Sequence, residues 1–237
     1  MNLVLDIGNT SIKAGWFSGT SILHYQVFGR DFPAGNWWEF NGADPGAVFY
    51  CSVRKQDPSA LSSLPVLAQK LNYDTPLPIR NRYQTPESLG PDRLANAVGG
   101  MVKFPGKNVI ILDAGTCLKT DLVISKGEYL GGAISPGLRM RYQALHSFTE
   151  RLPLLEPVPE TPLTGNNTSE SIHSGVLHGM MAEIVGIIEE YSQSYKDPVF
   201  ILTGGDHPVF LSRLKSRIFA APALTLEGLN AILLHNQ

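Results

Sequence analysis

Two copies of one short pattern constrain this chain more than any other feature of its sequence. Residues 3–10 read LVLDIGNT, and residues 110–116 read IILDAGT. Each copy is an apolar run that ends in an aspartate, followed by one residue, a glycine and then a hydroxyl side chain. A short apolar run bounded by a turn predicts a buried strand. The sequence therefore predicts that two halves of the chain begin with the same strand and turn.

The chemistry of the repeated turn points to phosphate. A carboxylate at the end of a buried strand is costly unless something compensates it, and hard divalent cations prefer oxygen ligands. The glycine lets phosphate oxygens approach backbone N–H groups, which form an anion-binding concavity. Hydroxyls and a charge come from Thr10, Ser11, Thr116 and Lys13. One copy alone would more often be a plain turn, but two copies favour a clamp for a nucleoside triphosphate.

Further elements alternate along the chain and indicate an α/β fold. Strands are expected at residues 1–6, 11–17, 21–28, 47–53, 108–124 with a turn, and 198–203, the last of these ending in the glycine turn TGGD at 203–206. Such a turn could hold adenine and ribose against bare backbone. Helices are expected at 57–71, with Pro65 as a point where this helix could be split, and at 92–104, 139–152, 166–195 and 226–235. The repeated pattern predicts two domains, 1–106 and 107–237.

The longest expected helix has a clear start and a clear buried face. Asn167 is a candidate N-cap, and Glu170 three residues later completes a capping-box pattern. Apolar residues recur every four positions, as a buried stripe requires: Ile172, Val176, Met180, Ile184 and Ile188. Gly175 and Gly179 on the same helix indicate either close helix packing within the chain or a dimer seam.

Composition excludes several classes of function. The formal net charge is -2 and no basic cluster is present, which argues against nucleic acid as a partner. The N-terminal residues lack the pattern of a signal peptide, and no apolar run approaches the ~20 residues of a membrane span. The two cysteines, Cys51 and Cys117, are far apart, which argues against a disulfide framework. We therefore expect a soluble, cytoplasmic protein without a membrane partner.

The repeated pattern resembles the superfamily of acetate kinase, sugar kinases, Hsp70 and actin. Six segments narrow the resemblance to the type III pantothenate kinases, in order and rough spacing: DIGNTSIK, GPDR, DAGT, GGAISPG, NNTSESIHSG and TGGD. GPDR lies between the two phosphate motifs, where that family carries G-x-D-R. The resemblance covers nearly the whole chain and is weakest over residues 20–80. It implies two duplicated ribonuclease H-like (actin-like ATPase) domains with a nucleotide cleft between them.

The resemblance also implies roles for individual residues. ATP would contact Thr116 and the first phosphate loop, which comprises Asp6, Ile7, Gly8, Asn9, Thr10, Ser11, Ile12 and Lys13. Asp113 would coordinate a monovalent cation, K⁺ or NH₄⁺, while Mg²⁺ would accompany ATP. Asp92 would be the general base. The substrate would contact Tyr83, Gly90, Pro91, Asp92, Arg93 and Thr168.

The activity implied is ATP-dependent phosphorylation of pantothenate to 4'-phosphopantothenate, the first step of coenzyme A biosynthesis, by a homodimer. The alternative is a non-catalytic ATP-binding regulatory module of the same superfamily. Only a small-molecule kinase needs Asp92 and Arg93 at an acceptor site; from residue type alone they would be an ordinary helix-start acid and a surface base. Likewise, Tyr83 would be a packed loop aromatic and Thr168 a helix cap.

One residue departs from the family pattern. After DAGT the family often has small or β-branched residues, whereas this chain reads CLKTD, with a charge at Lys119. Lys119 could point to solvent or toward the phosphates. The expected monovalent-cation site at Asp113 depends on which of these is true.

Overall fold

A computed structural model describes residues 1–214 and 218–237. Two compact units are described separately below. Unit 1 comprises Met1–Gly106, Val123–Gly131 and Ala223–Gln237, and unit 2 comprises the described residues of Lys107–Leu122 and Gly132–Pro222. The domains expected at 1–106 and 107–237 were divided at the repeated motif, whereas the two units are divided by contacts within the structure. By contacts, the segment Ala223–Gln237 belongs to unit 1.

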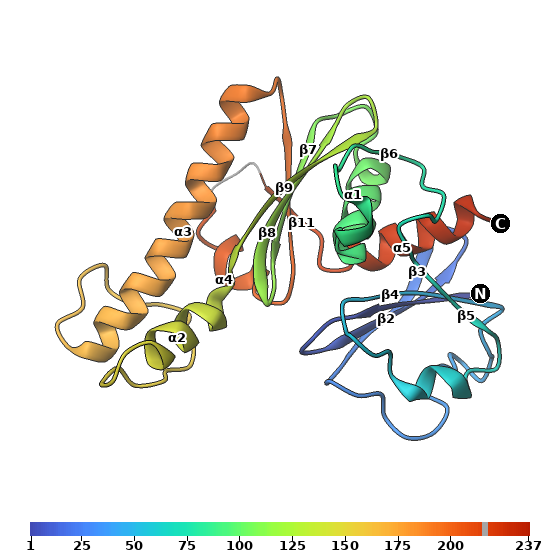
Figure 1. Cartoon of the computed structure of the whole chain (residues 1–237), viewed down its shortest axis with the longest axis horizontal. Coiled ribbons are helices and arrows are strands. Elements are labelled where there is room, and N and C mark those ends of the chain that lie inside the picture. Colours follow the sequence, from blue (N-terminus) through green and yellow to red (C-terminus); the bar gives the residue numbers. More distant parts are fainter. Residues whose placement is uncertain (215–217) are drawn as a thin grey trace. The chain divides into compact units, whose positions relative to one another are not determined.

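Unit 1 contains a five-stranded sheet in the order β3-β2-β1-β4-β5 (Figure 1). The strands are β1 (Asn2–Ile7), β2 (Ile12–Ser18), β3 (Ser21–Phe28), β4 (Ala47–Ser52) and β5 (Ala68–Lys70). β1 pairs antiparallel with β2 and parallel with β4. The first four strands were expected from the sequence and are confirmed. β1 is central because both of its faces are apolar, with Leu3, Val4, Leu5 and Ile7 fully buried.

One helix expected in this unit is wrong. Residues 57–71 form only the short 3₁₀ helix η1 (Ser59–Ser63), and β5 follows it. Leu64, which precedes Pro65, has extended backbone angles (φ -65°, ψ 146°). A residue before proline is disfavoured in the helical region, so the helix ends there. A second 3₁₀ helix, η2 (Pro86–Ser88), and the two-residue strand β6 (Arg80–Asn81) were not expected.

Helices α1 (Pro91–Lys103) and α5 (Leu224–His235) pack against each other in unit 1. Their contact is close because glycines leave backbone against backbone. A Cβ atom at Gly228 would lie 1.8 Å from the carbonyl oxygen of Ala95, and one at Gly99 would lie 2.6 Å from that of Leu224. The buried hydroxyl of Thr225 donates a hydrogen bond to Oδ1 of Asn96 at 2.8 Å. These contacts hold α1 at one position on α5.

Unit 2 repeats the sheet of unit 1. Its strands are β7 (Val109–Ala114), β8 (Cys117–Ile124), β9 (Glu128–Pro136), β10 (Val199–Thr203) and β11 (Ile218–Ala220), in the order β11-β10-β7-β8-β9. The two-residue link between β7 and β8 requires an antiparallel hairpin, and β7, β10 and β11 run parallel. Read from β9, this order matches β3-β2-β1-β4-β5 strand for strand. The tip of the β8–β9 hairpin belongs to unit 1, where β6 pairs with β9.

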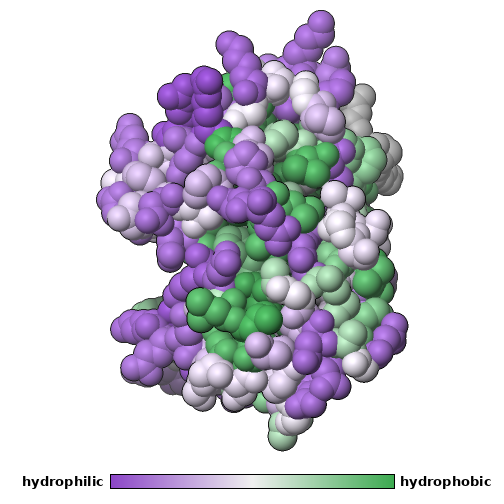
Figure 2. Space-filling view, turned by 90° about the vertical axis from the view of Figure 1, so that its right-hand side faces the viewer, coloured by the Kyte–Doolittle hydropathy of each residue, from purple (hydrophilic) through white to green (hydrophobic). Residues whose placement is uncertain are grey.

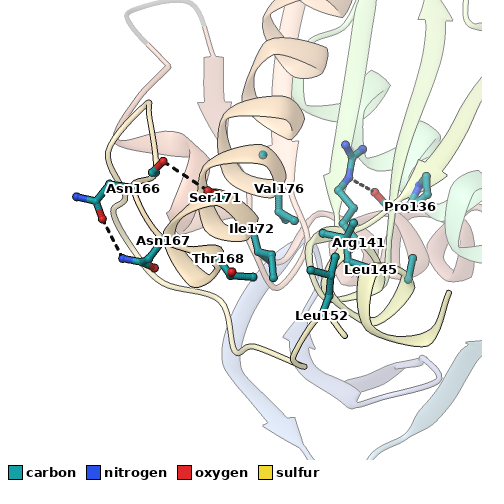
Figure 3. A pocket seen from close by; sticks show the side chains of 13 residues that line it. Pro136, Arg141, Leu145, Leu152, Asn166, Asn167, Thr168, Ser171, Ile172 and Val176 are labelled. Atoms are coloured by element: carbon teal, nitrogen blue, oxygen red, sulfur yellow. Dashed lines mark hydrogen bonds between the residues drawn. The ribbon is translucent and has the colours of Figure 1, made fainter. Parts of the chain in front are cut away.

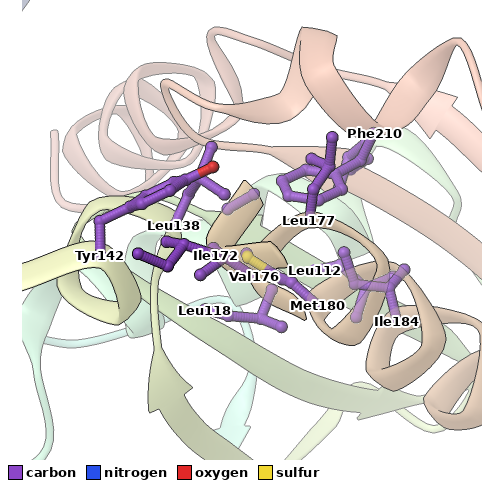
Figure 4. Packing of buried hydrophobic residues seen from close by; sticks show 12 residues of the cluster. Leu112, Leu118, Leu138, Tyr142, Ile172, Val176, Leu177, Met180, Ile184 and Phe210 are labelled. Carbon is purple, nitrogen blue, oxygen red and sulfur yellow. The ribbon is translucent and has the colours of Figure 1, made fainter. Parts of the chain in front are cut away.

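The core of unit 2 lies between this sheet and α3 (Thr168–Ser194), with α2 (Leu138–Ser147) and α4 (His207–Leu211) beside it (Figure 4). The expected stripe of α3 is confirmed: its first four members are buried, and Ile188 is partly buried. The side chain of Asn167 accepts the backbone N–H of Glu170 at 3.0 Å, as expected for the N-cap. The carboxylate of Glu170 accepts the N–H of Asn166 at 3.1 Å.

By length and composition, α3 is the one helix among residues 1–214 and 218–237 that could cross a membrane. It has 27 residues, but only 33% of its most apolar window is buried. Glu183 on this helix forms an ion pair with Arg141, and the stripe of Ile172, Val176, Met180 and Ile184 lies in the core of unit 2. These are the contacts of a core helix that leaves part of its apolar surface uncovered. Figure 2 shows other apolar side chains exposed among polar ones on the face that it presents.

The close contact of α1 and α5 can be tested by adding one methyl group. We expect Gly228→Ala to lower the free energy of unfolding by about 1–3 kcal/mol, because the new Cβ meets backbone that cannot move aside. Gly29→Ala is the matched control, since a Cβ there meets nothing within 4 Å. Urea unfolding followed by circular dichroism measures both; equal stability of the two variants would contradict the close contact.

Candidate functional site

The first repeated turn lies at the carboxyl end of β1. Lys13 on β2 is paired with Asp6 in the sheet, and its Nζ lies 3.6 Å from Oδ2 of Asp6. The thiol of Cys51 donates to Oδ1 of Asp6 at 3.6 Å. The N–H of Gly8 donates to the carbonyl oxygen of Ser11 at 3.0 Å, which closes the turn. The buried side chains of the loop, Ile7 and Ile12, anchor it in the core, while Asn9 and Thr10 are exposed at its tip.

Arg54 is a neighbour of this turn that the sequence analysis missed. It follows β4, whose last residue pairs with Ile7, and its Nε donates to the carbonyl oxygen of Gly8 at 2.7 Å. Its Nη2 is buried and has no hydrogen-bond partner among the described residues. Such a buried guanidinium nitrogen can donate a charge-assisted hydrogen bond to an anion held at the turn. The signal available in the sequence was a basic pair, Arg54 and Lys55, directly after a buried strand.

The second repeated turn lies at the carboxyl end of β7 and has the same construction. The N–H of Gly115 donates to the carbonyl oxygen of Cys117 at 3.1 Å. Nζ of Lys119 lies 2.8 Å from Oδ2 of Asp113, and both side chains are largely buried. Thr116 is exposed at the tip. Lys119 therefore points to Asp113 rather than to solvent.

The glycine turn after β10 lies directly against the second turn. Thr203 pairs with Asp113 in the sheet, and the N–H of Asp206 donates to the carbonyl oxygen of Ala114 at 2.8 Å. Gly204 has φ +90°, and a Cβ there would lie 2.5 Å from Oδ1 of Asp113. Burial raises the pKa of the Asp206 carboxyl, and Arg139 partly opposes this shift in pKa. The conformation and the space both require glycine at residue 204.

The start of α1 brings together residues that the sequence analysis assigned one by one. Pro91 and Asp92 open the helix after Gly90, and a Cβ at Gly90 would lie 2.6 Å from Oδ1 of Asp92. The Arg93 side chain is 4% exposed, and its guanidinium carbon lies 5.7 Å from the ring centre of Tyr83. The N-terminal end of a helix favours a carboxylate. A half-buried acid, a buried guanidinium and an aromatic ring thus form one cluster in unit 1.

The Tyr83 ring is held in place by its neighbours in unit 1. It lies 6.3 Å, centre to centre, from the ring of Tyr129, which is fully buried. Gly131 has φ +98°, and a Cβ there would lie 3.0 Å from the Tyr83 ring. The backbone N–H of Tyr83 donates to the side chain of Asn81 at 3.0 Å. The ring therefore has little freedom to move away from Arg93.

Thr168 lies in unit 2, at the mouth of a pocket of about 900 Å³ (Figure 3). The start of α3 and one side of α2 line it with mainly apolar side chains; its wall is formed by Pro136, Arg141, Ala144, Leu145, Leu152, Gly165, Asn166, Asn167, Thr168, Ser171, Ile172, Gly175 and Val176. Nε of Arg141 donates to the carbonyl oxygen of Pro136 at 2.9 Å. Of these residues the sequence predicted only Thr168, although the segment NNTSESIHSG forms much of the wall and GGAISPG supplies Pro136.

Two further side chains stiffen the helices around this pocket. The hydroxyl of Tyr142 on α2 and Nδ1 of His173 on α3 lie 2.9 Å apart in a hydrogen bond, and burial raises the pKa of Tyr142. Glu183 on α3 accepts from Ser135 and pairs with Arg141. These contacts fix α2 on α3, so the pocket is largely preformed.

Within the described residues, no group of three or more His, Cys, Asp and Glu side chains is placed to hold a metal ion. Mg²⁺ is often bound through one or two carboxylates together with substrate phosphates. The carboxylate of Asp6 at the first turn fits that mode of binding better than a metal cage made by the protein alone.

Comparison with known proteins agrees with this geometry. A sequence profile of the type III pantothenate kinases matches residues 2–190. A relative from Cytophaga hutchinsonii, named type III pantothenate kinase, is 45% identical over 237 residues, which cover 100% of both chains. A relative of the same name from Christiangramia forsetii is 41% identical over 248 residues, covering 100% of this chain and 99% of the relative.

Solved structures share the fold at lower identity. A conserved protein from Campylobacter jejuni, assigned to the Baf family of transcriptional activators, has a TM-score of 0.65 and 22% identity, with 99% of this chain and 98% of that chain covered. The activator of 2-hydroxyisocaproyl-CoA dehydratase from Clostridium difficile, with bound ADPNP, has a TM-score of 0.55 and 11% identity, with 99% and 93% covered. The repeated sheet and these neighbours confirm the expected duplicated ribonuclease H-like fold. The full-length similarity of its relatives means that the chain belongs to the type III pantothenate kinase family.

Proposed function

We propose that this chain phosphorylates pantothenate with ATP and Mg²⁺ to give 4'-phosphopantothenate, the first step of coenzyme A biosynthesis. The observation that carries the proposal is the cluster at the start of α1, where Asp92 is followed by the buried Arg93 stacked near Tyr83. A module that only binds nucleotide has no need of this cluster. The names of the full-length relatives support the same substrate.

The two repeated turns supply the phosphate-binding groups. Backbone N–H groups of the first loop, the hydroxyls of Thr10 and Ser11, and Lys13 bind phosphate oxygens, and Thr116 binds from the second turn. Arg54 adds its buried guanidinium to the first turn. Asp6 would hold the Mg²⁺ that accompanies the phosphates, directly or through a water molecule, and the ion would neutralise phosphate charge. Phosphoryl transfer depends mainly on such positioning and neutralisation of charge.

The acceptor side supplies a base and a recognition group. Asp92 takes the proton from the primary hydroxyl of pantothenate as its oxygen bonds to the γ-phosphorus, and the bond from that phosphorus to the β–γ bridging oxygen breaks to release ADP. Arg93 binds the pantothenate carboxylate, which a guanidinium can hold with two hydrogen bonds. Tyr83, Gly90, Pro91 and Thr168 are further substrate contacts that we carry over from the resemblance.

The resemblance assigns a monovalent cation, K⁺ or NH₄⁺, to Asp113. From that assignment we keep one element, a single positive charge beside the Asp113 carboxylate. Without this charge the carboxylate and the ATP phosphates would repel each other.

The working assembly that we propose is a cytoplasmic homodimer joined along α3. Gly175, Gly179 and Gly186 lie on one side of this helix, and a Cβ at any of them would meet nothing within 4 Å. Val185 nearby is 38% exposed. A row of small residues lets a second helix approach closely. The pocket that contains Thr168 includes Gly175 in its wall, so a partner chain on this side would lie next to the substrate.

We expect Asp92→Asn to lower kcat by ~10²–10⁴-fold, the usual contribution of a general base. The affinity for ATP should change little, because the phosphate turns are untouched. Steady-state kinetics with pantothenate, and calorimetry with an ATP analogue, give the two values. Glu87→Gln is the matched control: it removes the same charge from an exposed position just before α1. If Asp92→Asn turns over like the wild type, Asp92 is not the base, and Asp6 becomes the better candidate than the buried Asp121.

Arg93→Ala should act on binding rather than on turnover. We expect it chiefly to raise KM for pantothenate, through loss of a charge-assisted pair, with a smaller effect on kcat. Because Arg93 is buried, thermal unfolding of the variant must be recorded alongside the kinetics. A wild type that binds ATP yet phosphorylates no pantothenate would instead favour the alternative, a regulatory ATP-binding module.

The dimer makes a separate prediction. Light scattering should give about twice the mass of one 25.8 kDa chain, and Gly179→Leu should shift the protein toward the monomer. Ser192→Leu adds similar bulk to an exposed site about 140° around α3, and should leave the dimer intact. A wild-type monomer with full activity, or a Gly179→Leu dimer as tight as the wild type, would rule out this seam.

A further inference from the structure

The ion pair at the second turn is a largely buried contact that the phosphate-binding roles above do not explain. Nζ of Lys119 lies 2.8 Å from Oδ2 of Asp113, and their side chains are 16% and 12% exposed. Asp113 is the carboxylate to which the resemblance assigns K⁺ or NH₄⁺. An alkylammonium is itself a monovalent cation that binds a carboxylate through short, charge-assisted hydrogen bonds. The position expected for an ion from solution is therefore next to a charge that belongs to the chain.

The first half of the chain contains the same pair. Lys13 lies 3.6 Å from Asp6, with side-chain exposures of 17% and 13%. The turn between them is closed from Gly8 to Ser11, whereas the second turn is closed from Gly115 to Cys117 and is one residue shorter. This difference in turn length explains why the lysine follows the aspartate by seven residues in the first half and by six in the second.

The residues beside the two lysines also correspond. In each half the lysine is half-buried on the second strand of the hairpin and stands between two buried residues, Ile12 and Ala14 in one half and Leu118 and Thr120 in the other. Lys119 is thus the structural counterpart of Lys13. A chance surface lysine would not share its place on the second strand, its burial and its aspartate partner.

We propose that the Lys119 ammonium takes the place of the monovalent cation, so that ATP binding and turnover by this chain do not depend on K⁺ or NH₄⁺. The proposal rests on the proposed function, since ATP is the ligand beside the turn. The donor set does not fit a second cation: Oδ2 of Asp113 already binds an ammonium, and Gly204 brings backbone to within van der Waals contact of Oδ1. Two positive charges about 4 Å apart also repel each other strongly within a protein.

Lys119 is a positioning residue in this account, because it acts through Asp113. Its ammonium cancels the charge of the carboxylate, and so lets phosphate approach the N–H groups of the second turn. Unlike an ion from solution, it is covalently held and involves no binding equilibrium. The charge is then present at any potassium concentration.

The wild-type protein provides the first test. Binding of a non-hydrolysable ATP analogue with Mg²⁺ is measured by calorimetry in buffer free of sodium, potassium and ammonium, and again with potassium chloride or ammonium chloride, while tetramethylammonium chloride keeps the ionic strength constant. We expect the same Kd in all three conditions, and the same kcat with pantothenate. A severalfold gain in affinity with potassium or ammonium would overturn the proposal.

Removal of the ammonium should create the dependence that the wild type lacks. Lys119→Met keeps the length of the side chain, and we expect it to weaken binding of the ATP analogue about tenfold to a hundredfold without potassium, as loss of a charged hydrogen bond does. Potassium or ammonium should restore much of that loss. Lys103→Met is the control, because it breaks an ion pair of equal length, Lys103 to Glu227 at 2.8 Å, outside the turns.

The results of these experiments decide between this proposal and its alternatives. Analogue binding by Lys119→Met that equals the wild type without potassium would overturn the role of Lys119. Weak binding that neither potassium nor ammonium restores, with thermal unfolding unchanged, would overturn the equivalence of ammonium and ion. If the variant does not fold, the wild-type measurement still decides. Because calorimetry needs no pantothenate, failure of the kinase assignment would leave this test intact.

Discussion

The structure is organised around a buried carboxylate at the end of a central strand, used twice. A strand flanked on both sides by others has fully buried apolar residues, and an aspartate at its end is only partly solvated. Such a group must be paired, because an isolated buried charge costs far more than the fold can sustain. In both halves the second strand of the hairpin supplies a lysine. The glycine turn between acid and base then has its N–H groups next to a neutralised carboxylate, as an anion site requires.

The repeated turn was predictable because it is local. Strand, aspartate, glycine and hydroxyl are adjacent in the sequence, and the strands β1, β2, β4, β7, β8 and β10 follow from apolar runs. The capping of α3 by Asn167 and its buried stripe were predictable for the same reason. The helix expected at 57–71 failed on an equally local rule, since Pro65 excludes helical backbone at Leu64. The break that Pro65 could cause was foreseeable from the sequence, and in the structure it ends the helix.

The features of the site that could not be predicted from the sequence depend on contacts between residues that are far apart in the chain. Arg54 reaches the first turn only because β4 ends beside β1, and the pocket around Thr168 needs α2 and α3 together. The direction of Lys119 was likewise open, because the side of the strand that it occupies depends on the length of the preceding turn. Tyr83 and Arg93 were each assigned by resemblance, and the structure supplies the ring contact that links them.

The packing of α5 on α1 explains why the end of the chain matters for the proposed acceptor site. The residues at the start of α1 can hold a substrate at a defined angle only if the helix itself is fixed. Gly99 and Gly228 bring the two helices into backbone contact, and the hydrogen bond between Asn96 and Thr225 prevents them from sliding. Because Arg93 lies only three residues before Asn96, a shift of α5 would move its guanidinium directly. Helix α5, which has 12 residues, therefore helps to hold the first residues of α1 in place. More than a hundred residues separate the two helices in the sequence.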